Sequence, residues 1–358
     1  MTSPHHNPAG TDGFEFLEFT AKEVAPLRDL FHLLGFTHVA NHKTKAVELW
    51  KQNDLNFLIN AEPNSFAAAF AEIHGPSVCG MAFRVKDIAV AKKHIIEQGA
   101  KPFAHKEGDW FDAETSPVFE GIGGNMLYLV DRYGQQDFYV DAFEYLPNAS
   151  EALRENNAGL NYLDHVTHNV FRGNMDKWAG FYEKLFNFRE IRYFDIEGKV
   201  TGLFSRAMTG PCSKLRIPIN ESADDKSQIE EFLKDYNGEG IQHIAMGTDD
   251  IYKTVEFLRA RGMNFLHTPD TYYKGVDARV PEHGEDLERM RENRILIDGA
   301  PTPDGGRLLQ IFTETAIGPV FFEIIQRKGD EGFGEGNFRA LFESIELDQM
   351  ERGVLEKV

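Results

Sequence analysis

The chain contains two stretches that align without a gap, CGMAFRVKDIAVAKKHIIEQGAKPF at residues 79–103 and QHIAMGTDDIYKTVEFLRARGMNFL at residues 242–266. In each, a strand-like segment is followed by an aspartate that can cap a helix, an apolar helical stripe and a glycine typical of a helix end. The aligned pairs include Gly80 with His243, Ala82 with Ala245, Asp87 with Asp250, Ile88 with Ile251 and Gly99 with Gly262. The match predicts the same strand–helix unit in both halves of the chain.

A different unit precedes each of these stretches. GFEFLEFT and PLRDLFHLLGF form the first, within residues 13–36, and LDHVTHNVF and MDKWAGFYEKLFNF form the second, within residues 163–188. Each reads as an alternating strand, an amphipathic helix and an aromatic-ended turn. Four units therefore follow one another in the order A, B, A′, B′, which indicates two similar domains. The polar segment LPNASEALRENNAG, residues 146–159, separates the two pairs and marks the boundary. Because more than one strand-like stretch follows each helix, the pattern favours an α+β fold over alternating α/β.

The composition is that of a globular protein that binds small molecules. Of 358 residues 42% are hydrophobic, and 57 acidic against 38 basic residues give a net charge of −19. Nucleic acid and anionic membranes are therefore not expected as partners. Only two cysteines occur, and the sequence has neither an apolar run of membrane length nor an N-terminal signal. These features predict a cytoplasmic protein, and residues 1–12 are expected to be a disordered tail.

Metal chemistry is indicated only in the second half. There LDHVTHNV replaces the GFEFLEF of the first half, and His243 stands where the first half has Gly80. His165 and His168 are three residues apart, so on a strand their side chains point to opposite faces. Only one of these two can enter a site shared with His243, and the spacing does not choose between them.

Glu323 supplies a third candidate ligand. Its carboxylate lies in the apolar run PVFFEIIQ, where an ionised group needs a cation, hydrogen-bond donors or a basic partner. With two histidines it completes a two-histidine, one-carboxylate set, which fits non-haem Fe(II) with open positions. Zinc is also compatible with this ligand count. A carboxylate paired with arginine or lysine is the alternative without a metal.

The segments around Glu323 indicate an aromatic ligand. Gln310 and Phe312 share one strand face by period two, and Phe321 shares the face of Glu323. A polar amide beside phenyl rings suits a flat aromatic molecule with a polar end. GFGEGNF, residues 332–338, leads into the amphipathic FRALFESIELDQM and is interpreted as a hinge before a C-terminal lid helix.

Over nearly its whole length the chain resembles the 4-hydroxyphenylpyruvate dioxygenase family of the vicinal oxygen chelate superfamily, and the match is densest in seven motifs that follow one another in order within residues 163–338. They are LDHVTHNV, PINE (218–221), SQIEEFL, NGEGIQHIA, LLQIF, PVFFEIIQRKG and GFGEGNF. The resemblance implies an α+β fold of two vicinal-oxygen-chelate (glyoxalase/bleomycin-resistance-like) domains, each of paired βαβββ modules in an open, barrel-like sheet. Residues 13–150 would form a metal-free N-terminal domain. Residues 151–358 would form the catalytic domain, with the Fe(II) site and the lid helix.

Carried over residue by residue, the resemblance implies that one Fe(II) per chain is bound by His165, His243 and Glu323. It thereby prefers His165 to His168. It further implies catalytic roles for Ser205, Asn220, Gln228 and Gln310, and substrate contacts for Gln242, Phe312, Phe321, Phe333, Asn337 and Phe338. Strand parity places Gln242 opposite His243, so a peripheral role is expected for this amide.

The reaction implied by the resemblance is the O2-dependent conversion of 4-hydroxyphenylpyruvate to homogentisate and CO2 in tyrosine and phenylalanine catabolism. It combines oxidative decarboxylation, ring hydroxylation and side-chain migration. A homo-oligomer, dimer or tetramer, is expected. The nearest alternative is 4-hydroxymandelate synthase, which uses the same substrate and metal. An extradiol catechol dioxygenase and a non-catalytic aromatic-binding module are remoter alternatives, and three intact ligands argue against a mere binder.

Overall fold

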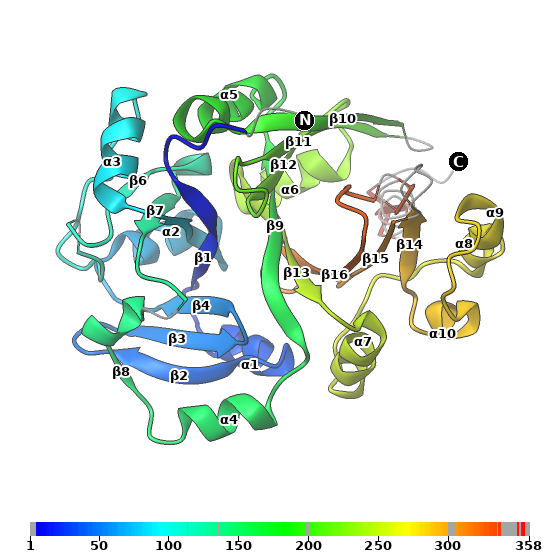
Figure 1. The fold of residues 1–358 in the computed structure, drawn as a ribbon, viewed down its shortest axis with the longest axis horizontal. Helices are drawn as coiled ribbons and strands as arrows, with labels where there is room; N and C mark the ends of the chain where they lie inside the picture. The colour runs from blue at the N-terminus through cyan, green and yellow to red at the C-terminus, as the bar shows by residue number, and fades with distance from the viewer. Residues whose placement is uncertain are drawn as a thin grey trace.

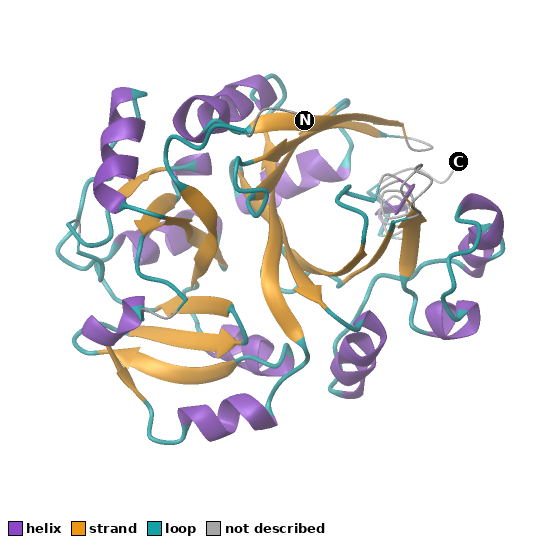
Figure 2. Ribbon diagram, viewed as in Figure 1, coloured by secondary structure: helices purple, strands orange, loops and turns teal. Residues whose placement is uncertain are grey.

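The protein is built on two eight-stranded sheets, one from each half of the chain (Figures 1 and 2). The computed structural model describes residues 5–112, 114–134, 137–197, 201–299, 306–334, 336–337, 349–350 and 352–354. Residues 338–348, most of the expected lid helix, lie outside the described residues. Within them, no helix is long and apolar enough to cross a membrane.

The first half contains strands β1 (Thr11–Thr20), β2 (Thr37–His42), β3 (Val47–Gln52), β4 (Leu55–Asn60), β5 (Ser77–Val85), β6 (Val118–Glu120), β7 (Met126–Val130) and β8 (Phe143–Tyr145). Its helices are α1 (Ala25–Leu33), α2 (Phe66–His74), α3 (Ile88–Glu97) and the short 3₁₀ helices η1 (Ile122–Gly124) and η2 (Phe138–Asp141). The strand order is β6-β7-β5-β1-β4-β3-β2-β8.

The second half contains strands β9 (Leu160–Val170), β10 (Arg189–Glu197), β11 (Gly202–Thr209), β12 (Arg216–Ser222), β13 (Gly240–Thr248), β14 (Leu296–Gly299), β15 (Arg307–Phe312) and β16 (Phe321–Lys328). Helix α4 (Ala149–Glu155) precedes them, and the others are α5 (Met175–Phe186), α6 (Gln228–Tyr236), α7 (Ile251–Ala260), α8 (Asp270–Tyr273), α9 (Val276–Arg279) and α10 (Leu287–Glu292). The strand order is β10-β11-β12-β9-β13-β16-β15-β14, which matches the first sheet in its central pairings.

The central pairings repeat between the halves. The two modules of each half meet at an antiparallel pair, β1 with β5 and β9 with β13. Beside it lie parallel pairs, β1 with β4 and β5 with β7 in the first half, and β9 with β12 and β13 with β16 in the second. The α+β fold of repeated modules expected from the sequence is thus confirmed.

The second sheet curls into a half-barrel (Figure 1). Helices α5, α6 and α7 pack on its outer face, against β11–β12, β12–β9–β13 and β16 respectively. Both modules of this half have the βαβββ order, so the three strands that carry candidate ligands lie next to one another.

The first half departs from the paired modules at its last strand. β8 pairs with β2 of the other module and not with β6. The chain reaches β8 through η2, whose Phe138 and Tyr139 are buried against the ring of Phe16 on β1. Aromatic side chains therefore pack together on the face of the first sheet to which Phe16 points.

The helix signals of the aligned stretches act as the sequence predicts. The carboxylate of Asp87 accepts a hydrogen bond from the backbone N–H of Val90, and that of Asp250 accepts one from Lys253. Gly99 and Gly262 follow the helix ends with φ of 92° and 96°, a left-handed conformation that favours glycine.

Two boundaries differ from the sequence expectations. β1 begins at Thr11, and the side chain of Asn7 bonds to the backbone of Thr11, so ordered structure starts before residue 13. The segment expected to be a linker contains α4, which packs against β2, where the carbonyl of Ala152 accepts a hydrogen bond from Thr37. The helix therefore packs on the first half, while its cap residue Asn156 also accepts a hydrogen bond from Arg261 in the second half.

Candidate active site

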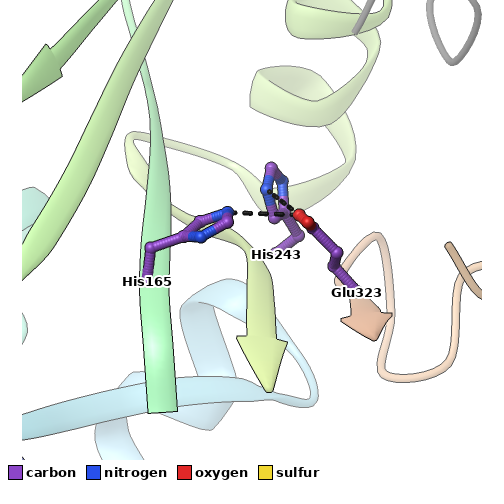
Figure 3. A group of neighbouring side chains, drawn as sticks. All are labelled: His165, His243 and Glu323. Carbon is purple, nitrogen blue, oxygen red and sulfur yellow. Dashed lines mark ion pairs between the residues drawn. The ribbon is translucent and has the colours of Figure 1, made fainter. Parts of the chain in front are cut away.

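Three neighbouring strands of the half-barrel direct one side chain each to a common point (Figure 3). Nε2 of His165 on β9 lies 3.1 Å from Oε2 of Glu323 on β16, and Nε2 of His243 on β13 lies 3.5 Å from the same oxygen. All three residues are buried, and one ligand atom from each lies within 4.8 Å of the other two. Two imidazoles and a carboxylate at this spacing are a donor set that can hold a metal ion.

Two β-bulges place a hydrogen-bond acceptor behind each histidine. The β9–β13 register skips one residue at Asp164 and another at Gln242, each the direct neighbour of a candidate ligand. Nδ1 of His165 lies 2.9 Å from an oxygen of Asp164, and Nδ1 of His243 lies 3.0 Å from Oε1 of Gln242. Because both Nδ1 atoms have acceptors, both Nε2 atoms are left for a ligand.

Strand parity therefore misplaces the side chain of Gln242, while its peripheral role towards the substrate stays a prediction. Parity assumes an uninterrupted pleat, whereas the extra residue in β13 lets this amide contact the neighbouring imidazole. Gln242 also lines an open groove beside the cavity, together with Gln228 on α6 and Phe321 on β16.

Without a metal, the pKa values of the two imidazoles are shifted in opposite directions. Burial lowers the pKa of His165, but the carboxylates of Glu323 and Asp164 outweigh burial and raise this pKa to about 9. Burial and the nearby charge of His165 hold the pKa of His243 well below its usual range. Consistently, Nε2 of His243 lies 2.9 Å from Oγ1 of Thr167, which donates to a neutral ring.

Metal binding is therefore expected to release one proton at pH 7. His165 is protonated below its pKa of about 9 and must lose that proton to bind a cation through Nε2. The apparent affinity should accordingly rise about tenfold per pH unit between pH 6 and pH 8. Titration calorimetry in buffers of different ionisation enthalpy counts the protons. A proton count near zero would contradict a charged His165 in the metal-free protein.

His168 lies on the other face of β9, as strand parity predicts. It is fully buried, with Nε2 2.7 Å from Oη of Tyr182 on α5. Burial lowers its pKa to about 3, so the ring is neutral and serves the packing of α5 on the sheet.

A small pocket opens above the three candidate ligands, with about 20 Å³ of space that the centre of a water-sized sphere can reach. The pocket is lined by side chains from strands β9–β13, β15 and β16 and from the segment after β16: His165, Thr167, Phe194, Ser205, Pro218, His243, Gln310, Phe312, Glu323 and Phe333. Thr167, Phe194 and Pro218 were missed by the sequence analysis. Period two from His165 would have indicated Thr167, and PINE contains Pro218, but no sequence signal marks Phe194.

One side of the concave face carries buried polar atoms without protein partners. Oγ of Ser205, Oδ1 of Asn220 and Nδ2 of Asn169 have no hydrogen bond among the described residues. Ser205 and Asn220 are direct neighbours across β11 and β12, and Asn220 is opposite Asn169 on β9. An unpaired buried polar atom is unfavourable by about 1–3 kcal/mol, so this row suits a polar group of a ligand. Asn169 was not singled out from the sequence.

Two amide side chains hold the carboxylate of Glu323: Gln310 contacts it directly, and Asn337 contacts Gln310. Nε2 of Gln310 donates to Oε1 of Glu323 at 2.7 Å, and Nδ2 of Asn337 donates to Oε1 of Gln310 at 2.8 Å. Their amides thus orient Glu323 from the side away from the histidines. Phe321 stacks on His243 with ring centroids 4.9 Å apart. Phe338 lies outside the described residues.

The register of the first half shows what replaces the three ligands there. In the strand pairing, Gly80 lies opposite Glu18 just as His243 lies opposite Thr167. Likewise, Ala82 lies opposite Tyr128 just as Ala245 lies opposite Glu323. Phe16, Gly80 and Tyr128 accordingly take the places of His165, His243 and Glu323. The hydroxyl of Tyr128 donates to buried Glu18 at 2.5 Å, and its ring packs on Phe16. Among the described residues, the cluster in the second half is the one group of three such ligands.

Comparisons with known proteins agree with this architecture. A family model described as hydroxyphenylpyruvate dioxygenase, N-terminal, matches residues 5–144, and one described as the glyoxalase/bleomycin resistance protein/dioxygenase superfamily matches residues 162–277. A 4-hydroxyphenylpyruvate dioxygenase of Pseudomonas aeruginosa is 60% identical over 98% of both chains. The chain belongs to the 4-hydroxyphenylpyruvate dioxygenase family. The resemblance and the dioxygenase class inferred from the motifs are confirmed.

The relatives of this dioxygenase chain carry more than one name. A Vibrio vulnificus protein named hemolysin VllY is 63% identical over 98% of both chains. A solved structure of a mutant 4-hydroxymandelate synthase from Streptomyces coelicolor is 25% identical, with a TM-score of 0.79 over 95% of this chain and 99% of that one. The synthase thus shares the fold at far lower identity, and the alternative of a mandelate synthase is not favoured.

Proposed function

We propose that this protein converts 4-hydroxyphenylpyruvate and O2 to homogentisate and CO2, a step in tyrosine and phenylalanine breakdown. The observation that carries the proposal is the convergence of His165, His243 and Glu323 at an aromatic-lined cavity, in a chain 60% identical to a 4-hydroxyphenylpyruvate dioxygenase. An extradiol enzyme is disfavoured by the family, and a non-catalytic binder has no need of three converging ligands.

The metal that we propose is Fe(II), one per chain, held by His165, His243 and Glu323. Two imidazoles and one carboxylate are the donor set of non-haem Fe(II) oxygenases, and the burial of Glu323 among apolar side chains is eased by a cation. When bound, Fe(II) supplies open positions for the 2-oxo acid and O2 and the redox chemistry between them. Asp164 and Gln242 hold the imidazoles with Nε2 free, and Gln310 holds the carboxylate.

The cavity walls orient the substrate. Phe194, Phe312 and Phe333 offer apolar surface to the ring and exclude water from the reacting atoms. Ser205 and Asn220 hold unpaired polar atoms for the phenol hydroxyl. We assign further substrate contacts to Gln228, Gln242 and Phe321 in the adjoining groove and to Asn337 beside Gln310. Phe338 lies outside the described residues, and its substrate contact stays the one that the resemblance implies.

An anaerobic reconstitution tests the proposal. The apoprotein is mixed with Fe(II) and 4-hydroxyphenylpyruvate, O2 is admitted, and the aromatic product is identified by chromatography. We expect homogentisate with one CO2 per turnover. A 4-hydroxymandelate product would replace the proposal with the synthase reaction. Absence of any product from an iron-loaded chain would overturn it.

Replacing Ser205 by alanine is expected to reduce the preference for 4-hydroxyphenylpyruvate over phenylpyruvate about tenfold. Phenylpyruvate keeps the 2-oxo acid and lacks the hydroxyl, so the comparison isolates the phenol end. Removing one hydrogen-bonding partner of a buried group costs about 1–3 kcal/mol. The ratio of kcat/KM for the two substrates is measured by competition.

Gln228→Leu is the second arm of this comparison. Gln228 lines the groove and not the cavity, so this variant asks whether the substrate reaches the groove. We expect a smaller loss of preference than for Ser205→Ala. An unchanged ratio would remove Gln228 from substrate recognition, and an unchanged ratio in Ser205→Ala would place the hydroxyl elsewhere.

A cytoplasmic location and a homo-oligomer, dimer or tetramer, remain our predictions for this chain. The net charge of −19 supports a small-molecule substrate and no nucleic-acid or anionic-membrane partner. Fractionation of cells and light scattering of the purified protein would test the location and the oligomeric state.

A further inference from the structure

A fully buried carboxylate lies behind His165, on the side away from the cavity. Asp164 accepts hydrogen bonds from Nε and Nη2 of Arg327 at 2.7 and 2.8 Å, in addition to its contact with Nδ1 of His165 at 2.9 Å. Nη1 of Arg216 lies 3.6 Å from it. Planar, bidentate pairing with arginine fixes both oxygens of a carboxylate. Asp164 is therefore held in one orientation, with one of its oxygens toward the imidazole.

Arg327 has a second set of partners. Its Nη1 donates to the carbonyl oxygens of Asp330 and Gly332 at 2.9 and 2.6 Å. The next residue, Phe333, lines the cavity, and its ring lies edge-on to His165 with centroids 5.6 Å apart. A single guanidinium thus connects the carboxylate behind His165 to the segment that covers the same imidazole from the cavity side.

We propose that Asp164 and Arg327 are positioning residues that set the metal affinity of His165, and that Arg327 also holds Phe333 against the cavity. The inference rests on the proposed metal at His165. An acceptor behind a metal-binding histidine fixes the ring and increases its basicity, and its loss typically weakens metal binding by roughly 10–100-fold. The second contact set of Arg327 adds an effect on the substrate that Asp164 alone does not have.

The first half provides a matched control, because the same bulge position there carries a pair with no histidine. Glu15, the counterpart of Asp164 in register, is also buried at a β-bulge and pairs with Nε of Arg84 at 2.6 Å. Arg84 also pairs with Asp54. A buried carboxylate–arginine pair at this position can therefore serve folding alone, and the control measures that contribution.

The test compares Asp164→Asn, Arg327→Lys and the control Arg84→Lys. The Fe(II) dissociation constant is measured anaerobically by chelator competition, and the unfolding of each apoprotein is measured in parallel. We expect roughly 10–100-fold weaker Fe(II) binding for Asp164→Asn and Arg327→Lys. For Arg84→Lys we expect an apoprotein that unfolds more easily and an unchanged Fe(II) dissociation constant. Asp164→Asn is isosteric, so it keeps the test available if Arg327→Lys does not fold.

The KM for 4-hydroxyphenylpyruvate, measured at saturating Fe(II), separates the two roles. The KM should rise several-fold in Arg327→Lys, because a single ammonium group replaces a guanidinium that makes four hydrogen bonds. In Asp164→Asn the KM should stay near the wild-type value. Unchanged Fe(II) binding in both variants, with apoprotein stability lowered as in Arg84→Lys, would overturn the inference and leave the proposed function standing. A wild-type chain without affinity for Fe(II) would overturn both.

Discussion

Replacing Glu323 by glutamine, or either His165 or His243 by alanine, is expected to abolish tight metal binding and turnover while the apoprotein still folds. One ligand atom from each residue lies within 4.8 Å of the other two, so each variant removes one of three donors. The loss should exceed the roughly 100-fold effect of changes behind the ligands. Metal content after dialysis and the unfolding transition of each apoprotein are measured together. A variant with full metal content would remove its residue from the proposed site.

His168 supplies the control for this series, because it lies on the same strand and faces away from the site. Alanine would leave a cavity beside α5, whereas glutamine keeps a polar partner for Tyr182. His168→Gln should therefore retain its metal and lose about 1–3 kcal/mol of stability. If His168→Gln lost its metal while His165→Ala kept it, the assignment of the two strand faces would be reversed.

The repeats and the side chains of the concave face near Glu323 could be predicted because each rests on a regular pattern. Period two sends Gln310, Phe312 and Glu323 to the concave face, and capping signals at Asp87 and Asp250 start their helices where the alignment places them. Spacing alone left His165 and His168 equivalent, and the family resemblance chose between them. The choice needs the packing of α5 on one face of β9, a long-range contact that local spacing does not encode.

The rule that successive side chains of a strand point to opposite faces failed where a strand carries an extra residue. The bulges at Asp164 and Gln242 are visible in the register and not in the residue types, since neither position is glycine or proline. Both contacts to Nδ1 of the candidate ligands depend on these bulges. Phe194 was missed for a related reason, because β10 reaches the cavity only when the sheet curls.

In the first half, Gly80 occupies the position that corresponds to the candidate ligand His243. A Cβ atom at Gly80 would lie 2.9 Å from the ring of Tyr128, closer than real Cβ atoms approach another atom, and a tight 3.3 Å from a carboxylate oxygen of Glu18. The glycine is thus needed for space and not for a special backbone angle. The tyrosine occupies the volume in which a histidine side chain would have to lie.

Gly80→His is accordingly expected to lower the free energy of unfolding by more than about 3 kcal/mol and to create no second metal site. Overpacking costs about 1–3 kcal/mol, and displacing Tyr128 leaves buried Glu18 without one donor, which adds about 1–3 kcal/mol. Gly180→Ala on α5 is the matched control, because a Cβ there meets nothing within 4 Å and alanine favours a helix. Denaturant unfolding of both variants and metal analysis of the folded chains check the expectation. Wild-type stability in Gly80→His would show that the first sheet can open at this point, and two metals per chain would show that an incomplete set of ligands suffices there.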